Sequence, residues 1–149
     1  MTPDKQTIAT LIANEGCILH AYQDTGKVWT IGYGTTLYPN GQHVKCGDVC
    51  TKDQALDYLI NAMTSAGNQI NALKLNLTQN QFDALVDFVY NSGIGHFESS
   101  QLFQLIKQNP NNPSIKATFQ ATGIRDRNGT ILNGLVARRT KEAELYFTK

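Results

Sequence analysis

The chain has 149 residues, of which 41% are hydrophobic and 17% are charged, and its formal net charge is +1. This length fits one ordinary domain with a buried core, and the composition is typical of a globular protein and excludes a disordered one. No apolar run of about 18 residues occurs, so we expect no membrane insertion. The first residues lack the basic start and apolar stretch of a secretory signal, and we therefore expect synthesis in the cytoplasm.

Positive charge gathers near the C-terminus, where all four arginines fall between Arg125 and Arg139. Such a bias favours an anionic polymer as partner, but it is too weak to indicate nucleic acid, and we expect no nucleic-acid partner. The alternative is that these arginines form ion pairs with glutamates on a solvated helix.

The three cysteines are an odd number, which excludes a full disulfide framework. His43, Cys46 and Cys50 form an H-x2-C-x3-C pattern in a loop, but no second Cys/His pair follows to complete a zinc site. We therefore expect no metal and no cofactor. Free thiols and a local Cys46–Cys50 bridge remain as alternatives.

The first predicted element is a helix over about residues 3–15. Thr2 is expected as its N-cap and Pro3 as its first helical residue, with apolar residues at helical spacing behind them. Gly16 is the natural end of this helix.

Between residues 17 and 49 the pattern changes to short strands and turns. A turn signal covers residues 24–26, and residues 28–33 are strand formers with a period of two. A small antiparallel sheet is predicted, with too few large apolar residues to be stable without helices behind it.

The rest of the chain predicts only helices. Thr51 and Gln54 form a capping box that opens the longest helix, over residues 51–73, which would span about 33 Å and suits a spine between two lobes. Four further helices are predicted: one opened by a capping box of Thr78 and Gln81, and three over about 99–107, 113–121 and 135–147, with a tight turn at 127–130 before the last.

Two carboxylates and a hydroxyl near the first helix suggest chemistry. Hydrolysis of a glycosidic bond needs two carboxyl groups in different environments. Glu15 lies at a helix C-terminus, where unpaired carbonyls disfavour negative charge, and it suits a proton donor. Asp24 lies in a polar turn and suits the ionised base, and Thr30, six residues on, could hold a water against it. Taken singly, each residue also fits an ordinary helix end, turn or strand.

The spacing Glu15-x8-Asp24-x5-Thr30 is followed by three further blocks in order. Together with TIGYGTT at 30–36, these are TQNQFDALVDFVYNSG at 78–93, GHFESSQL at 95–102 and GLVARRTKEAEL at 134–145. This combination resembles the phage-type lysozymes, the endolysins that hydrolyse bacterial peptidoglycan. The blocks cover nearly the whole chain, which is far more specific than any one of them.

The resemblance implies a mainly helical α+β lysozyme-like fold. A first lobe, about 14–50, carries the small antiparallel sheet, and a long helix, about 51–73, connects it to a helical lobe, about 74–149. The N-terminal helix, 3–15, is expected to pack on the helical lobe.

The resemblance also implies roles for residues. Glu15 is the general acid, Asp24 the second carboxylate and Thr30 the residue that positions water, in an inverting reaction.

Six further residues are expected to bind substrate. Gly32, Tyr33 and Thr35 belong to a strand that glycines leave open on one face. Asn91, Ser99 and Ser100 either bind acetamido and hydroxyl groups or cap helix ends.

The resemblance finally implies an activity: hydrolysis of the β-1,4 bond between N-acetylmuramic acid and N-acetylglucosamine, for bacterial cell lysis. The alternatives are a lytic transglycosylase and a peptidoglycan-binding module without catalysis. We expect a monomeric product of a phage or prophage, made in the bacterial host cytoplasm, that depends on a holin for access to the wall.

Overall fold

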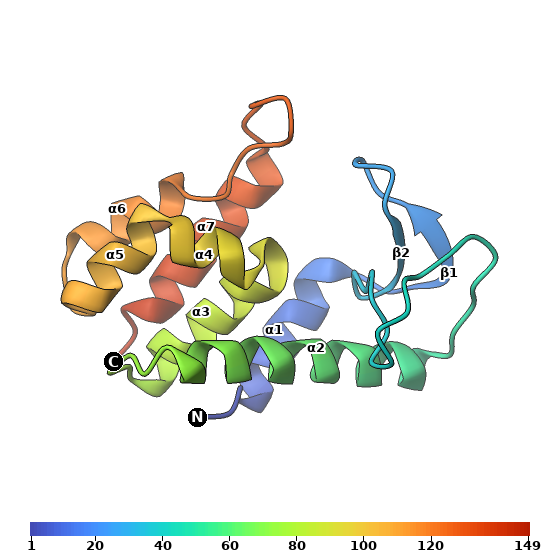
Figure 1. Cartoon of the computed structure of the whole chain (residues 1–149), viewed down its shortest axis with the longest axis horizontal. Coiled ribbons are helices and arrows are strands. Elements are labelled where there is room, and N and C mark those ends of the chain that lie inside the picture. Colours follow the sequence, from blue (N-terminus) through green and yellow to red (C-terminus); the bar gives the residue numbers. More distant parts are fainter. The chain divides into compact units, whose positions relative to one another are not determined.

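A computed structural model describes all residues, Met1–Lys149, as seven helices and one two-stranded antiparallel sheet (Figure 1). Its contacts divide the chain into two compact units. The sheet unit is Asp4–Ser65, and the helical unit is Met1–Pro3 together with Ala66–Lys149. The predicted α+β class with one small sheet is confirmed. None of the helices combines the length and apolar character that crossing a membrane requires.

Helix α1 (Lys5–Glu15) opens the sheet unit. Its N-cap is Asp4, whose Oδ1 accepts a hydrogen bond of 2.7 Å from the amide of Thr7. The prediction of Thr2 as the cap is therefore wrong, because the carboxylate two residues later both binds a free amide and suits the positive end of the helix. The helix ends at Gly16, as predicted, with a φ of 64°. By its contacts α1 groups with the sheet, and its packing on the helical lobe stays a prediction.

Strands β1 (Ile18–Gln23) and β2 (Trp29–Gly32) pair antiparallel, with Tyr22 opposite Thr30. The strand predicted at 28–33 is thus confirmed to within a residue at each end. Segment 48–50 adds two backbone hydrogen bonds, of 2.8 and 3.0 Å, to the other edge of β1.

Helix α2 (Lys52–Ala72) begins at the predicted capping box. The amide of Gln54 donates to Thr51 Oγ1 at 3.1 Å, and the amide of Thr51 donates to Gln54 Oε1 at 2.9 Å. Its apolar stripe is buried at Leu59, Met63, Ala66 and Ile70. Residues up to Ser65 belong to the sheet unit and the rest to the helical unit.

The helical unit is built around α3 (Gln79–Ser92), which packs on α7 (Asn133–Tyr146), as Figure 1 shows. The predicted capping box of Thr78 and Gln81 is present. Phe88 of α3 makes edge contacts with Phe97 and Phe119, with ring centroids 5.8 Å apart in both pairs. These aromatic contacts form the centre of the core.

Three short helices, α4 (Ile94–Ser99), α5 (Gln101–Gln108) and α6 (Ser114–Ala121), complete this unit. The helix predicted at 99–107 is α5, but α4 is missed, because glycines at 93 and 95 make the segment resemble a helix terminator. The burial of Phe97 in the core stabilises α4 despite that local sequence. The predicted turn at 127–130 is confirmed, with Gly129 at a φ of 81°.

Candidate active site

Asp24 lies in the turn between the two strands, and the turn fixes its side chain. Its Oδ1 accepts hydrogen bonds of 2.8 Å from the amides of both Gly26 and Val28. Its backbone amide also donates to the carbonyl of Val28 at 3.0 Å. One carboxylate oxygen is thus occupied by the turn, while Oδ2 takes no part in these bonds. The carboxylate has a set orientation on an exposed turn.

Thr30 stands on β2 and is only 4% exposed. Its hydroxyl donates to the carbonyl of Val28 at 3.0 Å. Because a hydroxyl has one hydrogen and two lone pairs, this bond leaves Thr30 Oγ1 able to accept a hydrogen bond from a water. That is the function expected of a residue that positions water.

Tyr22 lies within the electrostatic influence of both carboxylates. It lies opposite Thr30 in the sheet, and its pKa is raised by burial and by the negative charges of Glu15 and Asp24. Both carboxylates therefore lie close enough to act on one phenol hydroxyl. Tyr22 was not predicted from the sequence, although it lies only two residues before Asp24, near the end of β1.

Glu15 is the last residue of α1 and is half-buried. Gly16 follows at a positive φ of 64° and turns the chain into β1. An added Cβ on Gly16 would meet nothing within 4 Å, so glycine is needed here for its backbone conformation and not for space. This turn sets the direction in which the chain leaves the helix after Glu15.

The three predicted binding residues at and just after the end of β2 are packed inside the sheet unit. Tyr33 is 4% and Thr35 5% exposed, and an added Cβ on Gly32 would lie 3.0 Å from the Cβ of Ala55 on α2. The space left by Gly32 is therefore filled by a helix. Burial and the neighbouring Cys17 thiol raise the pKa of Tyr33. Substrate binding by these residues stays a prediction.

The predicted binding residues of the helical unit all bond to neighbouring groups. Ser100 Oγ accepts from the amide of Phe103 at 3.2 Å as the N-cap of α5. Ser99 Oγ donates to the carbonyl of His96 at 3.1 Å. Helix capping thus explains Ser100, and substrate contact by Asn91, Ser99 and Ser100 stays a prediction.

The arginines of α7 pair with acids inside the helical unit. Arg138 donates to Asp87, and Arg139, fully buried, donates to Glu142 and Asn91. Ion pairing with acids is confirmed for these two residues, but the expectation of a solvated helix is wrong for them, because both pairs are largely buried. Arg138 and Arg139 are therefore not available to a polymer, whereas Arg125 and Arg127 are exposed.

All three cysteines are free thiols. A local Cys46–Cys50 bridge is therefore not formed. Burial, and then the nearby Cys17, raise the pKa of Cys50. No group of three or more histidines, cysteines or acids is placed to hold a metal ion.

The end of α1, the turn between β1 and β2, and β2 itself thus carry Glu15, Asp24 and Thr30, the residues expected of a protein of the lysozyme class. The chain belongs to the phage lysozyme family, whose model matches residues 13–142. That match includes every residue of the candidate site.

Two relatives of this family match the chain over different shares of their own length. The chain is 36% identical to the endolysin of Acyrthosiphon pisum secondary endosymbiont phage 1, over 89% of this chain and 88% of the relative. It is 38% identical to the endolysin of Bacillus phage PZA, over 89% of this chain but 50% of that protein. The chain thus spans about half the length of the Bacillus phage relative.

Solved structures give the same family. The endolysin from Escherichia coli O157:H7 phage FAHEc1 aligns with a TM-score of 0.86 and 33% identity, over 99% of this chain and 94% of that chain. The muramidase domain of SpmX from Asticaccaulis excentricus aligns with a TM-score of 0.81 and 26% identity, over 98% and 97%. The lysozyme fold is shared over the whole of both units.

Proposed function

We propose that this chain is a muramidase that hydrolyses the β-1,4 bond between N-acetylmuramic acid and N-acetylglucosamine in peptidoglycan. The observation that carries the proposal is the match of the phage lysozyme family over residues 13–142, the stretch that holds Glu15, Asp24 and Thr30. The Asp24 turn, whose amides bind Oδ1 at 2.8 Å, and the Thr30 hydroxyl on β2 support it. The family of peptidoglycan-degrading enzymes supports the choice of substrate.

In the proposed reaction, Glu15 donates its proton to the glycosidic oxygen as the bond to the sugar carbon breaks. A water held by Thr30 Oγ1 attacks that carbon from the opposite face, and Asp24 takes the water's proton. The turn amides that bind Asp24 Oδ1 leave Oδ2 to act as the base. The products are a reducing sugar and an alcohol, with inverted configuration at the attacked carbon.

The product end tests this proposal directly. A muramidase releases N-acetylmuramic acid with a reducing end, whereas a lytic transglycosylase, which uses no water, releases an anhydro sugar. Mass analysis of digested peptidoglycan separates the two, because the products differ by one water. Anhydro ends would replace the proposal by the transglycosylase, and the absence of any new ends would indicate a binding module.

Asp24→Asn tests the base. Asparagine keeps an oxygen that can accept from Gly26 and Val28, so the turn should persist while the base is lost. We expect hydrolysis to fall by roughly 10²–10⁴-fold, the usual contribution of general acid–base catalysis. Glu15→Gln should cause a fall of the same order. An Asp24→Asn protein that is folded and fully active would contradict the assignment.

A matched control exists in the helical unit. Asp126 makes the same kind of turn, since its Oδ1 accepts from the amides of Asn128 and Thr130 at 2.8 and 2.9 Å. Asp126→Asn therefore makes the same chemical change in a similar turn. We expect it to keep the wild-type rate.

The proposal includes a route to the wall: a monomer made in the host cytoplasm that a holin admits to peptidoglycan. Relatives named endolysin and SAR-endolysin both occur, at 36% and 31% identity. Expression in bacteria with and without a holin tests the route by the onset of lysis. Lysis of equal speed without a holin would contradict it.

A further inference from the structure

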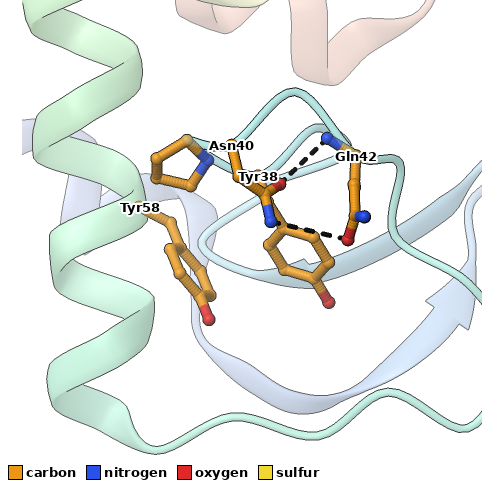
Figure 2. A pocket seen from close by; sticks show the side chains of 5 residues that line it. Tyr38, Asn40, Gln42 and Tyr58 are labelled. Carbon is orange, nitrogen blue, oxygen red and sulfur yellow. Dashed lines mark hydrogen bonds between the residues drawn. The ribbon is translucent and has the colours of Figure 1, made fainter.

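A pocket of about 400 Å³ opens on the sheet unit, and its lining includes neither the two carboxylates nor Thr30. It is lined by Tyr38, Pro39, Asn40, Gln42 and Tyr58. Figure 2 shows Tyr58 on α2 beside Tyr38, with the amides of Asn40 and Gln42 close to each other at the loop. Its volume lies within the range of roughly 300–1,000 Å³ that small-molecule sites occupy. We propose that this pocket binds an N-acetylated sugar unit as an accessory glycan site.

The loop side of the pocket is formed before any ligand arrives. The amide of Tyr38 donates to the carbonyl of Gln42 at 2.8 Å, and the amide of Gln42 donates to Asn40 Oδ1 at 2.9 Å. The Tyr38 hydroxyl donates to Asp48 at 2.7 Å, which fixes the ring. Little conformational freedom remains to be lost when a ligand binds, and this favours affinity.

Two aromatic rings supply the apolar wall. Tyr38 and Tyr58 meet edge to face, with ring centroids 5.2 Å apart, and both are half-buried. Pro39 extends this wall. A pyranose ring presents C–H groups on its face, which pack on such rings, while its hydroxyls reach outward. The wall therefore fits a flat, partly apolar sugar.

The polar side of the pocket is made of neutral groups. Asn40 Nδ2 bonds weakly to Gln42 Oε1, at 3.4 Å, and Gln42 Nε2 and the Tyr58 hydroxyl take part in no hydrogen bond of the protein. A primary amide can both donate and accept, as can an acetamido group. No charged side chain lines the pocket, which disfavours phosphates and carboxylates, because their desolvation would find no compensating charge. An uncharged sugar with an acetamido group fits these groups best.

The inference deepens the proposed function, since wall glycan consists of N-acetylated sugars. It does not depend on catalysis, however, and binding can be measured without turnover. The probe is the soluble β-1,4-linked trimer of N-acetylglucosamine, added to the full chain carrying Glu15→Gln. The measurement is the change in NMR chemical shift of each residue as the trimer is added. We expect saturable shifts at Tyr38, Gln42 and Tyr58.

Variants then identify the site. Tyr58→Ala should weaken the binding seen at these signals by about three- to tenfold, the usual range for one aromatic contact. Gln42→Ala, in an exposed turn, should weaken it too and provides a second variant if Tyr58→Ala does not fold. Ile60→Ala, on the same helix and 40% exposed, is the matched control and should change nothing.

Several results would overturn the inference. One is that the NMR shifts are confined to the carboxylate site. Another is that Tyr58→Ala and Gln42→Ala leave the binding at the pocket unchanged. A third is that a glucose trimer, which lacks the acetamido groups, binds equally well. A failure of the proposed function would show separately, as wild-type protein that releases no reducing ends from peptidoglycan. The two readouts therefore distinguish the two ideas.

Discussion

Replacement of the buried Arg139 by methionine should strongly destabilise the helical unit. The guanidinium donates to Glu142, to the carbonyl of Thr122 at 3.0 Å and to Ser92 Oγ at 2.7 Å, and it lies 4.4 Å from the ring centroid of Phe88. Methionine keeps the apolar stem and removes these interactions. Loss of one partner of a buried ion pair costs about 3–5 kcal/mol, and we expect the lower end because Glu142 can take up a proton.

The pH dependence tests that reason. Burial raises the pKa of Glu142 to about 8 against the attraction of Arg139 and Arg138, so the folded protein holds this proton more tightly than the unfolded chain does. The free energy of unfolding therefore falls as pH rises between about 4.5 and 8. Without Arg139 the pKa rises further and the fall continues to higher pH. The deficit of Arg139→Met should thus be larger at about pH 9 than at about pH 6.

Urea unfolding at both pH values measures this. The exposed Arg125, which donates to the carbonyl of Gly129 at 2.8 Å, offers a control, and Arg125→Met should cost less than about 0.5 kcal/mol. Adding Glu142→Gln to Arg139→Met should remove the extra pH dependence, because no ionisable group is left at that position. A deficit that is independent of pH, or below about 1 kcal/mol, would refute the electrostatic reasoning.

Two further predictions concern the sheet unit. Asp24→Asn should lower the raised pKa of Tyr22 toward its ordinary value, because it removes one of the two negative charges that raise this pKa. NMR titration of the phenol measures the change. An unchanged pKa would show that Asp24 does not act on Tyr22. Gly32→Ala should destabilise the protein by roughly 2 kcal/mol, because the residue has a φ of 66° and the new Cβ would lie 3.0 Å from the Cβ of Ala55. Gly41 is the control: its φ is 86°, but an added Cβ would meet no atom within 4 Å. Gly41→Ala should therefore show the backbone cost alone, about 1 kcal/mol. Thermal unfolding compares the pair, and equal losses would show that the contact with Ala55 is unimportant.

Local features of the sequence were sufficient for most of the helix boundaries. The capping boxes at Thr51 and Thr78 are confirmed because each bond joins residues three apart, and no distant part of the chain can easily replace it. Gly16 ends α1 for a similarly local reason, its positive φ. The Glu15, Asp24 and Thr30 spacing belongs to one continuous stretch, so a single helix end, strand and turn position all three.

Other features depend on contacts between segments that are distant in the sequence. Helix α4 exists because Phe97 reaches the aromatic core, a stabilisation that the glycines around it conceal. The open face expected beside Gly32 is filled by Ala55, which is 23 residues later by number, because α2 packs against β2.

The family, the order of elements and the three residues proposed for catalysis can be read from the sequence, because they depend on short-range spacing and local hydrogen bonds. The surroundings of these residues depend on the folded chain. Folding brings Tyr22 under the influence of both carboxylates, and it pairs Tyr38 with Tyr58 to form a pocket. Side chains from separate elements come into contact only when the hydrophobic core forms, and such contacts cannot be predicted from spacing along the chain.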